Sequence, residues 1–109
     1  MKLAELDPRW CSTAGRHGMG ISFNCPCCLA KGILDRWVVY FAKPIDGGEP
    51  FPMEPGQKDR MRWSRQGDTF ETLTLAPSVN LTTDGNERLG VIPVQHWHGF
   101  FHNGEVITV

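Results

Sequence analysis

The sequence has no apolar run long enough to cross a membrane: its longest one, at residues 37–42, has only six residues. The first eight residues also lack the apolar segment of a secretion signal, so we expect a soluble, cytoplasmic protein. A basic surplus is missing too, since the net charge is −1 with neutral histidines. Proteins that bind a nucleic-acid backbone usually carry a clear positive excess, so the charge balance argues against that class.

The chain is short and rich in residues that interrupt helices. Its 109 residues, among them Gly 12 and Pro 8, predict one domain with a modest core, residues 1–109. We expect a small all-β or β-rich fold of antiparallel sheets. Residues 1–17 are predicted to be irregular apart from one helical turn near 3–6, and residues 43–60 to form a long loop. A core this small gains from a metal or covalent crosslink.

Several segments have the composition of β-strands. The run at 35–42 is almost continuously apolar and predicts a strand buried on both faces. The clearest signal is Asn103-Gly104 between two β-rich runs, because a type I′ hairpin turn needs φ > 0 at both positions. The predicted strands are 18–24, 35–42, 60–65, 69–75, 96–102 and 105–109, with a polar turn at 82–88.

The cysteines, at positions 11, 25, 27 and 28, point to a metal. Without a secretion signal their thiols should stay reduced, which favours metal binding over disulfides. Cys25 and Cys28 have the C-x-x-C spacing of a zinc knuckle. The competing interpretation is a redox pair, which usually opens a helix after a strand. We predict no such helix here and expect a turn over residues 29–32.

His96-Trp97-His98 supplies the second half of the predicted site. On a strand, residues i and i+2 lie on one face about 6.6 Å apart, so both imidazoles can face one ion while Trp97 faces the core. Cys25, Cys28, His96 and His98 together would form a closed, structural Zn²⁺ site between the predicted knuckle and the C-terminal hairpin.

Each half of the site has a simpler explanation. Two histidines on one strand face can be plain surface residues, and clustered cysteines can be small buried side chains. Cys27 in place of Cys28 would give a C-x-C pair, and we expect Cys11 to be a core residue. The metal hypothesis is favoured because both halves occur in one short chain.

Four segments resemble those of a protein family: GISFNCPCC at 20–28, WVVYFAKPIDG at 37–47, GDTFETLTLAPS at 67–78 and HWHGF at 96–100. The family comprises short, uncharacterised proteins of tailed bacteriophages, prophages and bacteria, with CPxC and HWHGF motifs; some members are mislabelled ammonia monooxygenase. Related domains occur beside bacterial ubiquitin-like conjugation genes. The resemblance covers residues 18–106 and implies Cys25, Cys28, His96 and His98 as the shared metal ligands.

Three functions follow as hypotheses. The favoured one is a structural zinc domain without catalysis, a phage-encoded or prophage adaptor whose protein partner contacts surface loops such as 43–60. The first alternative is a cupin-like metalloenzyme, in which His96, His98 and His102 share a strand face and leave coordination positions open.

The second alternative is a nucleic-acid-binding module in segment 58–65. Lys58, Arg60, Arg62 and Arg65 surround Trp63, on whose indole a base could stack. We favour the simpler interpretation that Trp63 belongs to the core.

Overall fold

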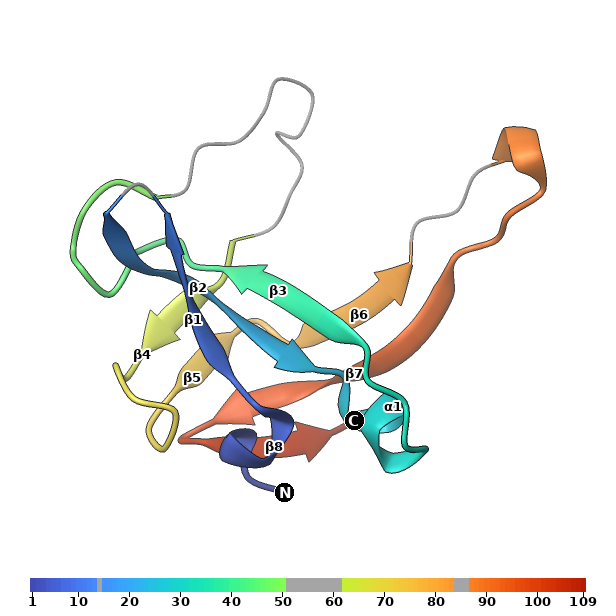
Figure 1. Ribbon diagram of the computed structural model, residues 1–109, viewed down its shortest axis with the longest axis horizontal. Coiled ribbons are helices and arrows are strands. Elements are labelled where there is room, and N and C mark those ends of the chain that lie inside the picture. Colours follow the sequence, from blue (N-terminus) through green and yellow to red (C-terminus); the bar gives the residue numbers. More distant parts are fainter. Residues whose placement is uncertain (14, 51–61, 84–86) are drawn as a thin grey trace.

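The computed structural model describes residues 1–13, 15–50, 62–83 and 87–109 (Figure 1). It is β-rich and consists of three small antiparallel sheets, so the predicted fold class is confirmed. No helix within these ranges is long and apolar enough to span a membrane.

The first sheet has the strand order β1-β2-β3, with β1 (Arg9–Thr13), β2 (Arg16–Asn24) and β3 (Arg36–Tyr40). The predicted irregular segment 1–17 is therefore wrong, because β1 pairs with β2 from Arg9↔Ser22 onward. The expected helical turn is present as the 3-10 helix η1 (Leu3–Leu6), whose two leucines are fully buried.

Only one face of β3 is buried, which corrects the expectation for 35–42. Val39 and Phe41 are 2% and 0% exposed, whereas Val38 is 45% exposed. The sheet covers the core with one face only, so alternate side chains of β3 point to the outside. Aromatic and β-branched residues on both faces concealed this alternation in the sequence.

The other two sheets are β4-β5 and β6-β7-β8. The sheet β6-β7-β8 contains the predicted C-terminal hairpin, in which His102 pairs with Glu105. Asn103 and Gly104 have φ angles of 47° and 76°, so the prediction of positive φ at both turn positions is confirmed. The strands are β4 (Ser64–Gln66), β5 (Thr74–Ala76), β6 (Val79–Thr83), β7 (Val94–His102) and β8 (Glu105–Thr108).

Two other local predictions need adjustment. The strand expected at 69–75 is shortened to β5, because Thr69 and Thr72 form a turn closed by their hydroxyls, 2.7 Å apart. Residues 82–83 extend β6, and the 3-10 helix η2 (Glu87–Leu89) follows; 84–86 lie outside the described residues. The predicted long loop contains no strand over 43–50, and 51–60 also lie outside them.

The hydrophobic core lies between the first and third sheets. Phe23 of β2 meets Phe101 of β7 edge to face, with ring centroids 5.0 Å apart. Trp97, 5% exposed, joins them and donates its indole N–H to Thr108, as expected for a residue facing the core. Cys25 belongs to the same buried cluster. This core fixes the end of β2 beside β7, where the cysteines and histidines lie.

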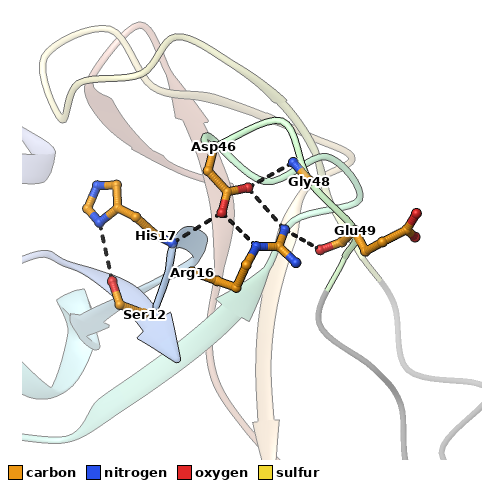
Figure 2. A network of polar contacts seen from close by, with 6 residues as sticks. All are labelled: Ser12, Arg16, His17, Asp46, Gly48 and Glu49. Atoms are coloured by element: carbon orange, nitrogen blue, oxygen red, sulfur yellow. Dashed lines mark hydrogen bonds and ion pairs between the residues drawn. The ribbon is translucent and has the colours of Figure 1, made fainter. Parts of the chain in front are cut away.

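A separate polar network fastens the β1–β2 turn to the loop after β3 (Figure 2). Both carboxylate oxygens of Asp46 accept from the Arg16 guanidinium, at 2.7 and 3.0 Å. Asp46 also accepts from the backbone N–H groups of His17 and Gly48, and Arg16 donates to the carbonyl oxygen of Glu49. The hydrogen bonds from Arg16 and Gly48 hold the pKa of Asp46 far below its ordinary value of 3.8.

We expect Asp46→Asn to lower the melting temperature at pH 7 and to reduce the loss of stability in acid. Because the folded-state pKa is lowered, the ionised Asp46 stabilises the fold above its ordinary pKa, and this contribution is lost as the pH falls towards the folded-state value. In thermal unfolding, the difference in melting temperature between Asp46→Asn and wild type should become smaller as the pH falls from about 5 to about 2. Asp68→Asn, at an exposed position, is the control; a difference independent of pH would contradict the charge explanation.

Candidate metal centre

A short helix, α1 (Pro26–Ala30), follows β2 directly and carries the cysteine cluster. Pro26 occupies its first turn, where the missing N–H costs nothing. The sequence prediction of no helix after this strand is therefore wrong. The unit is nevertheless not the parallel βαβ of a redox protein, since β2 and β3 are antiparallel neighbours.

The chain leaving α1 folds back on it and brings an acidic residue to the cysteines. The Cys25 N–H donates to the carbonyl oxygen of Asp35 at 2.8 Å, and the Ile33 N–H donates to that of Cys28 at 2.9 Å. These bonds close the loop between α1 and β3. They place the Asp35 carboxylate beside the Cys28 thiol.

Three side chains from separate places converge at this point. The Cys28 Sγ lies 3.7 Å from His96 Nδ1 and 3.8 Å from Asp35 Oδ2, and these last two atoms are 3.9 Å apart. His96 comes from β7, 68 residues after Cys28. The three ligand atoms thus form an almost equilateral triangle, in which a metal ion can be held.

The donor set and its spacing suit a divalent metal ion. Thiolate, imidazole and carboxylate are the three ligand types that Zn²⁺ takes in proteins. With Zn–S near 2.3 Å and Zn–N or Zn–O near 2.0 Å, tetrahedral ligand atoms lie about 3.3–3.6 Å apart. The observed 3.7–3.9 Å separations would contract by about 0.2 to 0.6 Å around such an ion.

The electrostatics of the site favour a cation. The pKa of the Cys28 thiol is raised from 9.0 to about 11, chiefly by loss of water contact and next by hydrogen bonding with Cys25. Negative charge on Cys25, Asp35 and Cys27 contributes to the same rise. The cluster therefore gathers several groups that repel one another when ionised, and a divalent ion would remove that repulsion.

The same shift argues against a cysteine nucleophile. A catalytic thiol has a lowered pKa, whereas that of Cys28 is raised. In a Cys-His-Asp triad the carboxylate orients the imidazole through the nitrogen opposite the thiol. Here Asp35 and Cys28 both approach Nδ1 of His96. The arrangement is that of ligands around one point.

The structure places the four residues of the predicted site in three different situations. Cys28 and His96 belong to the convergent group. Cys25 is fully buried and contributes to the raised pKa of Cys28, but it does not belong to the group of ligand atoms within 4.8 Å of one another. His98 is half-buried on the same face of β7 as His96, but its Nε2 lies 2.9 Å from the hydroxyl of Ser78. The complete ligand set stays a prediction.

The remaining cysteine and histidine positions lie outside this group of ligand atoms. Cys11 is half-buried on β1. Among the described residues, His96, His98 and His102 do not bring three ligand atoms within 4.8 Å of one another. Cys27 borders a groove of about 640 Å³ that also touches His96 and His98, so solvent has a path to the site.

The basic segment around Trp63 is used for internal contacts where the structure describes it. Trp63 packs against the core and donates its indole N–H to the Ser78 carbonyl oxygen. Arg65 donates to the carbonyl oxygens of Lys43 and Gly67, and its guanidinium lies 5.7 Å from the Phe41 ring centroid. Lys58 and Arg60 lie outside the described residues.

Asp35 is the member of the group that the sequence did not indicate. One of twelve acidic residues, it belongs to no ligand-spacing motif, and only the fold of 31–35 brings it to Cys28. The sequence prediction placed Asp35 inside the strand 35–42, whereas in the structure β3 begins at Arg36 and Asp35 precedes it. Comparisons of the chain with family models, curated proteins and solved structures find no match.

Proposed function

We propose that this protein is a structural zinc domain in which the ion crosslinks α1 to β7. The observation that carries the proposal is the triangle of Cys28, Asp35 and His96, whose donors come from chain segments 68 residues apart. Cys25 would supply the fourth ligand: its buried thiol contributes to the raised pKa of Cys28, and it would move closer on binding, since it lies outside the group of ligand atoms within 4.8 Å. Four protein ligands would leave the metal no open position, and its role would be to stabilise the fold.

The second part of the proposal is that the stabilised domain acts as a cytosolic adaptor, encoded by a phage or prophage as the family resemblance implies. Reduced thiols and zinc ligation both suit that compartment. η2 and the segment that joins it to β7 project from the body of the molecule (Figure 1). Leu89 and Ile92 on this projection are 76% and 75% exposed, an apolar surface of the kind that protein partners cover.

The test is metal content and ligand identity on tag-free protein. We expect one zinc per wild-type chain, and loss of that zinc in Cys28→Ser, His96→Ala and Cys25→Ser. His98→Ala is the matched control, because His98 sits two residues from His96 on the same face and bonds to Ser78.

Zinc retained by His98→Ala but lost by Cys25→Ser would support the proposed ligand set. Zinc lost by both His98→Ala and Cys25→Ser would favour the set expected from the sequence, because that set contains both residues. Wild-type protein that binds no zinc, or binds it equally after Cys28→Ser, would contradict the proposal.

A further inference from the structure

Trp37 touches two members of the metal group at once. Its indole N–H donates to Asp35 Oδ2 at 2.7 Å. This is the same oxygen that faces Cys28 Sγ and His96 Nδ1. The Trp37 ring also lies against the His96 imidazole, with centroids 5.6 Å apart and planes inclined at 56°.

We infer that Trp37 is a positioning residue of the zinc site, holding the Asp35 carboxylate and the His96 ring in the orientation that the ion needs. The inference rests on the proposed function. A carboxylate on a short side chain can rotate its oxygens away from an ion, and an imidazole can turn about its own bonds. A donor on Asp35 and a ring against His96 restrict both motions, as outer partners of metal ligands commonly do.

Comparison with other tryptophans separates this role from simple packing. Trp63 donates to a backbone carbonyl at 3.2 Å and Trp97 to a threonine hydroxyl at 3.0 Å. Trp37 donates to a carboxylate at the shorter distance, and hydrogen bonds to charged acceptors are the stronger ones. Trp37 and Trp63 are both partly buried, but Trp37 lies at the end of β3 nearest to the site. Phenylalanine would fill much of the same space without the donor.

The experiment compares Trp37→Phe with wild type and with Trp63→Phe. Trp63→Phe removes an indole N–H bond to a backbone oxygen and does not touch the metal group. Zinc affinity is measured by competition with a chromophoric chelator. We expect Trp37→Phe to bind zinc about 10- to 100-fold more weakly than wild type, the usual cost of losing an outer partner of a ligand. Trp63→Phe should bind zinc as wild type does.

A second measurement reports on geometry, which a purely structural residue would not change. Co²⁺ substituted for zinc absorbs visible light according to its ligands and their arrangement. We expect the Co²⁺ spectrum of Trp37→Phe to differ from that of wild type and the spectrum of Trp63→Phe to match it. Equal affinities and equal spectra for the two variants would overturn the inference while leaving the zinc site standing.

Two outcomes keep the inference distinct from the proposed function. If wild-type protein binds no zinc, the proposed function itself fails. If Trp37→Phe does not fold, NMR of the indole N–H groups in wild-type protein tests the inference instead. The Trp37 signal should move on addition of zinc while that of Trp63 stays in place; an unmoved Trp37 signal in zinc-bound protein would contradict the inference.

Discussion

Removal of zinc, or the substitution Cys28→Ser, is expected to lower the free energy of unfolding by about 4 kcal/mol. The ion would join Cys28 to His96 across 68 residues of chain. By the chain-entropy relation used for disulfides, a crosslink of that span contributes on the order of 4 kcal/mol, chiefly by restricting the unfolded chain. Domains of this size are usually stable by about 5–15 kcal/mol, so much of the stability should depend on the metal.

Urea unfolding with and without chelator measures this effect. Wild-type protein should lose stability on chelation, whereas Cys28→Ser should be less stable from the start and indifferent to the chelator. The two changes remove the same crosslink, so their effects should not add. Cys11→Ser is the control, since Cys11 is also half-buried but lies on β1 outside the metal group. Identical unfolding of zinc-loaded and chelated wild type would contradict a structural role for the metal.

The parts of the fold that sequence predicts well are those decided by neighbouring residues. Asn103-Gly104 specifies its hairpin because only a few residue types accept the left-handed backbone that the turn needs. The alternation in β7 is equally local, and it placed Trp97 in the core with His96 on the opposite face. Neither prediction required knowledge of the rest of the chain.

The parts that were missed depend on distant contacts. β1 has no clear alternation of apolar and polar residues, and it forms a strand because its backbone pairs with the edge of β2. The face of β3 that stays exposed is decided by which side of the sheet meets the core. Asp35 joins the metal group through backbone bonds around α1.

We expect Gly104, in the hairpin turn, to be among the positions of the fold that tolerate substitution least. Gly104 has φ of 76°, its N–H donates to the Leu73 carbonyl oxygen, and its own carbonyl oxygen accepts from the Leu3 N–H. A Cβ atom at this position would overlap the backbone carbonyl of Glu71. The turn therefore packs closely against the segment before β5 and against η1, and position 104 has no room for a side chain.

Gly104→Ala is accordingly expected to destabilise the protein by about 3 kcal/mol or more, by adding backbone strain to steric overlap. Gly47→Ala is the matched control, because Gly47 has the same φ of 76° but no atom within 4 Å of an added Cβ. Gly47→Ala should be destabilised by the backbone strain alone, by about 1 kcal/mol. Urea unfolding of both variants separates the two contributions. Equal losses would mean that the turn is not packed closely against Glu71, whereas a much larger loss at Gly104 would show that this close packing resists any side chain at the turn.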